Sequence, residues 1–367
     1  MGGGVTLATK ERRIFSELKT EVDAIVLKNA TDPNLDLSFF YATGIANGLF
    51  EDSVAIIRPR GVEVLTSALE ELSARESGVK TTVYATRKEA AAMLSKKLRG
   101  MKRIGINSTE LTHANYLSIK KCAKGTRLVD VSQSIAVARM KKDADELGRI
   151  KKACDIVSKT ADLIPEFVKA GMVETEAAAE INYRMMGMGA SGPSFPTNAS
   201  FGPATAEPHY SPGAMKLKKG QLALFDFGAM YRRYVSDLTR TFVCGRPSAA
   251  QEELHDVVLR AQIASIEAIH DGVHGKEVDM AGRRMIDSSR FKGKFTHSTG
   301  HGLGMSVHDP GSISSQRDMV LKEGMVLTVE PGAYVKAFGG VRIEDDILVT
   351  KKGCKILTSS SRDLISL

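Results

Sequence analysis

The stretch LALFDFGAMYRRYVSDLTRTF, residues 222–242, carries two aspartates inside a run of apolar and aromatic residues that is typical of a buried β-hairpin. Directly opposed residues of an antiparallel hairpin have a constant sum of positions, so a turn at Tyr231-Arg232 would make Asp226 and Asp237 cross-strand partners. Their β-carbons would then lie about 5 Å apart on one face of the ladder. Two carboxylates at that distance repel each other, which predicts a proton or a cation between them.

A second hairpin is predicted over GMVLTVEPGAYVKAFGGVRIEDDILVT, residues 324–350, and it repeats this arrangement. Glu330 and Glu344 become cross-strand partners if the turn is centred on Ala337, beside Gly339-Gly340. A single acidic residue in a strand is most often an edge charge that faces water, but two such pairs with apolar neighbours indicate a site. Four carboxylates plus a histidine suit two divalent ions of the Mn, Co, Fe or Zn type, which typically lie about 3.5–4 Å apart.

The histidine is expected from HSTGHGLGMSVHDPG, residues 297–311, which contains three of the eight histidines of the chain. A lone histidine is more often a core or surface residue than a ligand, but three histidines among glycines indicate a site, because glycine lets the backbone approach a ligand closely. We expect a glycine-rich strand over residues 297–308. His301 and His308 would face opposite ways on a regular strand, so the HGLG segment must bend if both reach one site.

The composition indicates a soluble globular protein with reduced cysteines. The chain has 367 residues, of which 43% are apolar and 26% charged, and this length favours two domains. It has no apolar run near the roughly 18 residues that a membrane helix needs, and its start, MGGGVTLATKERR, lacks the apolar core of a signal peptide. The four cysteines form no CxxC pair and no zinc spacing. We therefore expect a cytoplasmic protein with no membrane association.

The net charge of +8 comes from one part of the chain. Residues 81–160 hold 18 Lys and Arg against 7 Asp and Glu, so the remainder is slightly acidic. Most of these lysines fall on the solvent faces of predicted helices, with almost no aromatic residues among them for stacking on bases. The pattern favours a solvated face over a nucleic-acid partner, and a polyanion site stays as the alternative.

The order of the predicted elements divides the chain into residues 1–135 and 136–367. The first part alternates strand-like and helical runs and is predicted to be a small α/β domain. The strand-like runs are DAIVLK, SVAIIRP, VEVLTS, TTVYAT and RIGINS, with a hairpin turn at RPRG, and the helical runs are RRIFSELKTEV and KEAAAMLSKKL.

The second part begins with a long amphipathic helix, because apolar residues from Leu147 to Ile164 recur at spacings of three and four. Another helix, in ETEAAAEINYRMMG, precedes residues 188–213. This segment is so rich in Gly, Pro and Ser that we expect a long, irregular and functional loop. Helices at about residues 250–290 separate the two hairpins.

Four motifs give the C-terminal part a resemblance to the pita-bread metallopeptidases, the family of methionine aminopeptidase, aminopeptidase P and prolidase. They are DFGAMYRRYVSDLTRTF, HSTGHGLGMSVHD, LKEGMVLTVEPGAY and GGVRIEDDILVT, in the order of the family. FFYATGI and MKKDADELGRIKKAC resemble the N-terminal domain and linker helix of the prolidase and aminopeptidase P branch. The resemblance implies a creatinase-like α/β domain over residues 1–135 and an α+β pita-bread catalytic domain over residues 136–367.

The resemblance also implies a site for two divalent metal ions, of Mn, Co, Zn or Fe. The expected ligands are Asp226, Asp237, His301, Glu330 and Glu344. Of these, Asp237 and Glu344 would bridge the two ions. A water between the ions would be the nucleophile because two cations lower its pKa, and Glu330 would take its proton and pass it to the leaving nitrogen.

Further residues match family positions around the substrate. His209 and His308 match positions that hydrogen-bond the substrate and stabilise the tetrahedral oxyanion. Three others match positions that support these groups in the aminopeptidase P and prolidase branch, namely His297, Arg342 and Tyr334.

The expected substrates are peptides with proline at the second position, cleaved at the bond before proline by a homodimer. The RIED segment and the N-terminal domain separate the chain from methionine aminopeptidase. Many archaeal-type prolidases have an arginine, in a stretch like HExPRI, that binds the free carboxylate of a dipeptide. Here HDPGSI has Ser312 at that position, and Arg342 could replace the missing cation. Dipeptidase and aminopeptidase activity therefore both stay open.

Two other functions on this fold stay open as alternatives. One is metal-free hydrolysis of a small molecule, as in creatinase, which would not need five intact ligands. The other is binding of nucleic acid, ribosome or histone, which lost ligands would favour and which only the basic stretch supports. A salt-sensitive gel shift would distinguish it.

Overall fold

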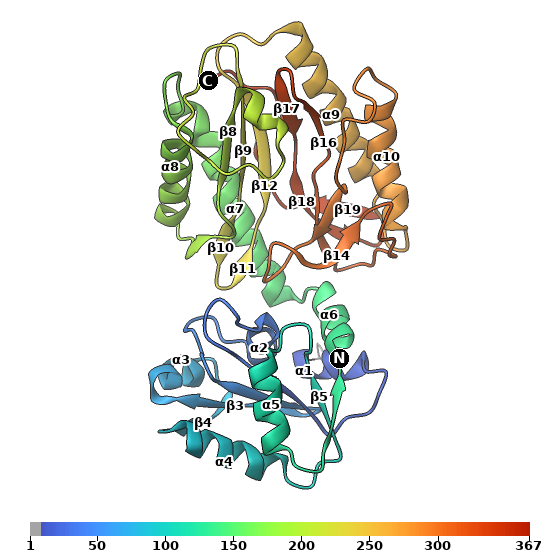
Figure 1. The fold of residues 1–367 in the computed structure, drawn as a ribbon. Coiled ribbons are helices and arrows are strands. Elements are labelled where there is room, and N and C mark those ends of the chain that lie inside the picture. Colours follow the sequence, from blue (N-terminus) through green and yellow to red (C-terminus); the bar gives the residue numbers. More distant parts are fainter. Residues whose placement is uncertain (1–8) are drawn as a thin grey trace, which may run out of the picture. The chain divides into compact units, whose positions relative to one another are not determined.

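The computed structural model describes residues 9–367, and internal contacts divide the chain into two units (Figure 1). Unit 1 ends at Arg139, and unit 2 spans Met140–Leu367. The first eight residues, which belong to the MGGGVTLATKERR start of the chain, lie outside the described residues. Among residues 9–367, none of the helices has the length and apolar character that crossing a membrane requires.

Unit 1 is built on a six-stranded mixed sheet with the strand order β4-β3-β2-β1-β5-β6. The five strand-like runs of the sequence form β1 to β5, and the RPRG turn is confirmed because Arg58 pairs with Gly61 across it. The strands are Ala24–Lys28 (β1), Val54–Arg58 (β2), Gly61–Ser67 (β3), Lys80–Tyr84 (β4), Arg103–Ile106 (β5) and Arg127–Asp130 (β6).

Helices cover the sheet of unit 1 and build its core. Leu94, Leu98 and Ile119 pack with strand residues such as Val26 and Ile104 in one cluster. The helices are Lys10–Ser16 (α1), Leu37–Thr43 (α2), Glu71–Glu76 (α3), Arg87–Leu98 (α4), His113–Cys122 (α5) and Ser132–Met140 (α6), with a short 3₁₀ turn at Ala68–Glu70 (η1). The first helix ends earlier than the RRIFSELKTEV pattern predicts.

Four helices frame the strands of unit 2, with α7 and α8 on one side and α9 and α10 on the other (Figure 1). Their bounds are Ala144–Phe167 (α7), Glu174–Gly187 (α8), Ala249–Glu267 (α9) and Gly275–Asp287 (α10), with a 3₁₀ turn at Gly202–Ala206 (η2). The long helix α7 begins with a capping box in which the side chains of Asp143 and Glu146 each accept a backbone N–H of the other residue. The predicted helices of this part are thereby confirmed.

The strands of unit 2 form a five-stranded sheet with the order β14-β13-β15-β18-β19 and three smaller sheets, β12-β9-β8, β11-β10-β7 and β16-β17. The strands are Gly192–Pro193 (β7), Asn198–Phe201 (β8), Leu222–Phe227 (β9), Ala229–Tyr231 (β10), Tyr234–Val235 (β11), Leu238–Val243 (β12), Gly300–Gly302 (β13), Asp309–Ile313 (β14), Val326–Val329 (β15), Gly332–Val335 (β16), Gly339–Arg342 (β17), Asp345–Thr350 (β18) and Gly353–Ile356 (β19).

The register of the first hairpin corrects the prediction. Asp226 pairs with Thr239 and not with Asp237, because the turn falls on Arg232-Arg233. Both turn residues have positive φ, 47° and 66°, as a type I′ turn requires. Asp237 lies two residues before Thr239 on the same strand, so it still shares a face with Asp226.

The second hairpin has the predicted register. Val329 pairs with Asp345 and Gly332 with Arg342, which places Glu330 and Glu344 opposite each other between the two ladders. Their turn is centred on Ala337.

Two predicted segments differ from the structure. Residues 188–213 are less irregular than expected, because β8 pairs with β9 over four residues, from Asn198 with Asp226 to Phe201 with Ala223. The glycine-rich strand expected over residues 297–308 is limited to β13, where the register shifts after His301. Asp309 and Pro310 lie where the β-carbon of a larger residue at Gly302 would be, so the chain turns closely at this glycine.

Candidate active site

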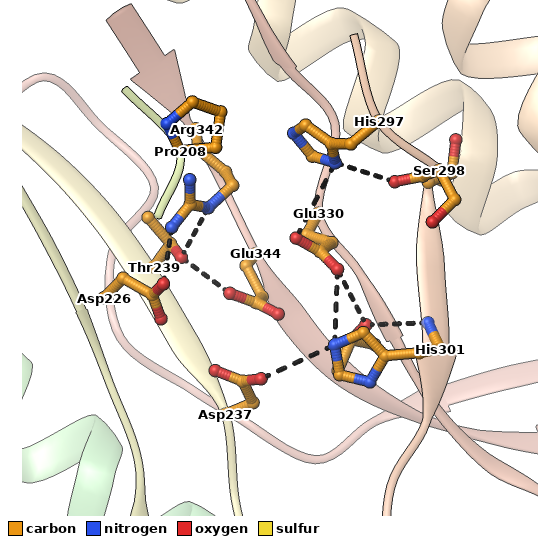
Figure 2. Close-up of polar contacts among 12 residues, drawn as sticks. Pro208, Asp226, Asp237, Thr239, His297, Ser298, His301, Glu330, Arg342 and Glu344 are labelled. Atoms are coloured by element: carbon orange, nitrogen blue, oxygen red, sulfur yellow. Dashed lines mark hydrogen bonds and ion pairs between the residues drawn. The ribbon is translucent and has the colours of Figure 1, made fainter. Parts of the chain in front are cut away.

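The four carboxylates of the two hairpins converge inside unit 2 (Figure 2). Asp226 lies on β9 and Asp237 precedes β12, whereas Glu330 follows β15 and Glu344 precedes β18. The hairpins are joined there, because the Glu344 backbone N–H donates to the Thr239 carbonyl at 3.2 Å. The structure therefore brings together the two pairs that the sequence predicted separately.

His301 completes the cluster from β13. Its Nε2 lies 3.3 Å from Glu330 Oε1 and 3.8 Å from Asp237 Oδ2. Its Nδ1 lies 3.2 Å from the Gly302 carbonyl, to which only a protonated Nδ1 can donate. Burial, together with the charge of His308, lowers the pKa of His301 to about 4. The imidazole is therefore neutral at pH 7, with the lone pair of Nε2 directed toward carboxylates.

The donor set fits a divalent metal site. One oxygen each of Asp226, Asp237 and Glu344 is buried without a hydrogen-bond partner. Ligand atoms of Asp237, His301 and Glu344 all lie within 4.8 Å of one another. Buried acceptors without a donor are costly, and a cation among them would satisfy both the oxygens and the imidazole lone pair. Oxygen ligands with one imidazole suit Mn, Co, Fe or Zn.

Burial raises the pKa of each of the four carboxylates. The pKa values of Asp237 and Glu344 are raised well above their usual range by burial and by the neighbouring carboxylates. Burial raises the pKa of Asp226 despite the opposing charge of Arg342. For Glu330, burial raises the pKa to about 8. The four groups therefore need positive charge, from protons or from metal ions.

Arg342 links the acidic cluster to His297 and Tyr334. Its guanidinium donates to Asp226 Oδ2 at 2.5 Å, to the Tyr334 hydroxyl at 3.1 Å and to Thr239 Oγ1 at 3.0 Å. His297 Nδ1 donates to the Ser298 carbonyl at 2.8 Å, so its Nε2 accepts the Tyr334 hydroxyl proton at 2.7 Å. The three predicted supporting residues thus form one hydrogen-bonded chain that ends on Asp226.

His308 and His209 lie differently around this cluster. The ring centroid of His308 is 4.5 Å from that of His301, which confirms the bend that the HGLG segment required. His209 is exposed on the segment after η2 and lies within electrostatic range of Asp226. His308 is therefore in contact with the cluster, whereas His209 stands at its edge.

Two residues at the site were not predicted. Thr239 Oγ1 donates to Glu344 Oε2 at 2.6 Å, and Asp346 Oδ2 accepts the Asp237 N–H at 3.0 Å and the Cys154 thiol at 3.3 Å. Strand alternation could have indicated Thr239, which is two residues from Asp237 and shares its face. Asp346 had no such signal, because an acid next to two others in RIEDD resembles a simple charge run.

Comparisons with known proteins agree with this geometry. Residues 148–351 match metallopeptidase family M24, and residues 12–141 match the creatinase/prolidase N-terminal domain. The Xaa-Pro dipeptidase of Pyrococcus horikoshii is 35% identical over 347 residues, which cover 95% of each chain.

Two solved structures share the fold over nearly the whole chain. The Xaa-Pro dipeptidase from Bacillus anthracis has a TM-score of 0.90 at 30% identity and covers 98% of this chain and 99% of its own. The X-Pro aminopeptidase from Thermotoga maritima MSB8 has a TM-score of 0.89 at 29% identity and covers 94% and 98%. The expected fold class, a creatinase-like domain followed by a pita-bread catalytic domain, is confirmed.

Proposed function

Because this chain belongs to metallopeptidase family M24, we propose that it hydrolyses the peptide bond before proline with the aid of two divalent metal ions. The chain is a peptidase, and its relatives include proteins named Xaa-Pro dipeptidase and X-Pro aminopeptidase. One observation supports the metal-dependent reaction most directly. Three buried carboxylate oxygens without partners lie in a cluster that also contains a neutral imidazole.

The proposed ligands are the five residues predicted from the sequence, Asp226, Asp237, His301, Glu330 and Glu344. When bound, divalent ions would lower the pKa of water and so supply a nucleophile at neutral pH. Asp237 and Glu344, the bridging pair that the family resemblance implies, would hold both ions, and burial and the neighbouring carboxylates raise their pKa values well above the usual range. A bridging position between two cations would remove the repulsion that raises those values.

The other residues of the site would transfer protons, donate hydrogen bonds to the substrate or hold Asp226 in place. Glu330 is the proposed general base, because a carboxylate with a raised pKa can accept a proton from water and pass it to the leaving nitrogen. His308 and His209 are the proposed donors to the substrate and the oxyanion. The chain from His297 through Tyr334 to Arg342 holds Asp226 in place.

The hydrogen bonds of Arg342 bear on the length of the peptides that the site accepts. All three nitrogens of the Arg342 guanidinium already donate to Asp226, Tyr334 or Thr239, and the residue is only 3% exposed. A second role as a clamp for the carboxylate of a dipeptide is therefore disfavoured. We propose that the protein accepts longer Xaa-Pro peptides as well as dipeptides. It would act in the cytoplasm as a homodimer, and the domain limits 1–135 and 136–367 are part of the same proposal.

Chelation followed by metal addition tests this function. The protein is stripped with a chelator and dialysed, and then assayed on an Xaa-Pro dipeptide and an Xaa-Pro-Xaa tripeptide with Mn²⁺, Co²⁺, Zn²⁺ or Fe²⁺. We expect the stripped protein to be inactive and a transition metal to restore cleavage before proline, because the nucleophile forms at neutral pH only with metal. Peptides with alanine in place of proline are the control. Full activity at a site shown to be empty by metal analysis would contradict the proposal.

A further inference from the structure

Lys142 and Asp309 form a buried ion pair that belongs to none of the roles above. Lys142 Nζ lies 3.0 Å from Asp309 Oδ2, and the two side chains are 1% and 2% exposed. Replacing a buried ion pair by apolar residues is often neutral or stabilising, because the desolvation of two charges offsets their attraction. Stability alone therefore does not account for this pair.

Asp309 connects the pair to the loop that carries His308. It directly follows His308, begins β14 and pairs with Gly302 across the register shift. Its carboxylate reaches back over Gly304, where an added β-carbon would lie 2.3 Å from Asp309 Oδ2 and 3.0 Å from Lys142 Nζ. The ion pair therefore packs directly against the backbone of the loop between His301 and His308.

Lys142 has a fixed backbone next to the strand that leads to Glu330. Its N–H donates to the Gly324 carbonyl at 2.9 Å, and the preceding residue forms an antiparallel bridge with Met325. Met325 directly precedes β15, which ends one residue before Glu330. The ammonium group is thus held relative to β15, and through Asp309 it can hold the His308 loop relative to the same strand.

We propose that Lys142 is a positioning residue for His308. Through its ion pair with Asp309, it holds the loop of residues 303–308 so that the imidazole of His308 stays against that of His301. The consequence for turnover rests on the proposed function, in which His308 donates to the substrate or the oxyanion. The consequence for the position of the imidazole does not depend on that function.

The first experiment follows the imidazole directly. Histidines of the full-length protein are labelled with ¹³C at Cε1, and spectra are recorded with excess Zn²⁺, which is diamagnetic. The His308 signal is identified by its loss in His308→Gln. We expect Lys142→Met to shift or broaden this signal and to leave that of His255, in the core of α9, unchanged. The matched control, Lys151→Met at an exposed position of α7, should move neither signal.

A double variant covers the case in which Lys142→Met does not fold because it removes the ammonium group from the buried Asp309 carboxylate. Lys142→Met/Asp309→Asn removes both charges of the pair and should show the same change of the His308 signal. An unchanged His308 signal in either folded variant would overturn the proposal. Global unfolding of both variants would assign the pair to the fold as a whole and would overturn it too.

The second experiment is a double-mutant cycle on activity. Lys142→Met should lower kcat/KM by about tenfold to a hundredfold and leave the metal content unchanged. This decrease is part of the decrease that loss of an oxyanion donor causes. In a His308→Gln background the same substitution should change kcat/KM by less than about threefold. Equal losses in both backgrounds contradict the proposal. If the wild type cleaves no Xaa-Pro peptide, the proposed function fails, and the histidine signal still decides the role of Lys142.

Discussion

Glu330 combines a raised pKa with a direct contact to an imidazole. In the metal-free chain its pKa is raised to about 8 by burial. It also has the most direct contact with an imidazole, at 3.3 Å from His301 Nε2. A group that exchanges protons during turnover works best when its pKa lies near the operating pH. These properties suit Glu330 to the proposed role of general base.

We expect Glu330→Gln to keep the fold and much of the metal but to lose turnover. An amide oxygen still offers a weak ligand, whereas it cannot carry a proton, so kcat should fall by about 10²- to 10⁴-fold. The measurements are kcat and bound metal per chain. Glu323→Gln, at an exposed position on the same approach to β15, is the control. Near-normal kcat in Glu330→Gln would remove this residue from the role of general base.

Ser312 is placed to influence substrate length. It pairs with His301 across the β13–β14 ladder, and directly opposed residues of such a ladder direct their side chains to one face. A cation here would lie on the same face as His301, a proposed metal ligand. The missing contact to a dipeptide carboxylate corresponds to about 1.5–3 kcal/mol, or roughly ten- to a hundredfold in specificity.

We therefore expect Ser312→Arg to shift preference toward dipeptides by about tenfold or more. The measurement is kcat/KM for a matched Xaa-Pro dipeptide and Xaa-Pro-Xaa tripeptide in both proteins. Ser312→Gln, which has a long polar side chain without charge, separates the effect of charge from that of size. A wild type that already prefers the dipeptide a hundredfold would mean that another cation binds the carboxylate. The absence of a cation at residue 312 would then have no effect on the preferred substrate length.

Among the secondary-structure elements, the turn of the first hairpin is strained at Arg232. Its φ of 47° lies in the left-handed region, which costs a residue other than Gly, Asn or Asp about 1 kcal/mol. We expect Arg232→Asn to raise the free energy of unfolding by about 0.5–1 kcal/mol and Arg232→Val, which is β-branched, to lower it. Urea unfolding of the two variants measures the difference. Equal stabilities would show that the turn conformation does not limit this hairpin.

The same turn explains why one register was predicted correctly and the other was not. The second hairpin has Gly339-Gly340 next to its turn, and glycines of this kind indicate a turn from sequence. The first has Arg232-Arg233, and no propensity indicates a left-handed turn at two arginines. The carboxylates were still placed on one face, because the error was an even number of residues.

Some features of the structure could be predicted from the sequence and others could not. The convergence of the five proposed ligands could be predicted because each lies in a short motif with its own glycines or apolar neighbours. The β8 strand was missed because Gly and Pro surround its four residues, and its pairing with β9 overrides their propensity. The ion pair of Lys142 and Asp309 joins residues that are 167 positions apart, and a single sequence contains no sign of such a contact.

At the scale of the whole molecule, the proposed metal ions would bind in only one of the two units. All five proposed ligands lie in unit 2, and unit 1 has a hydrophobic core of its own. A ligand that binds only the folded state stabilises the unit that holds it. Thermal unfolding should therefore contain one transition that responds to metal and one that does not.

The metal-responsive transition should depend on pH in the metal-free protein. Each of the four carboxylates has a raised pKa in the folded chain, so folding takes up protons. The stability that these groups contribute is fully present below pH about 4, the pKa of an unfolded carboxyl. It is lost as the pH rises through the folded-state pKa values, which for Glu330 is about 8. Each additional bound proton lowers the free energy of unfolding by about 1.4 kcal/mol per pH unit. Metal ions replace these protons, so the metal-loaded protein should show little of this slope, and the gain in Tm from Mn²⁺ should grow between pH 5 and pH 8.

Calorimetry with chelator and with Mn²⁺ measures both slopes. The variant Asp237→Asn/Glu344→Gln, which removes two of the groups, should flatten the slope without metal. The buried imidazoles of His297 and His301, with pKa values of about 4, oppose this slope below pH about 6.5. Above pH 7 only the carboxylates of the site contribute, so a metal-free Tm that rises with pH there would mean that the cluster is not held protonated, and the electrostatic reason for placing two cations there would be lost.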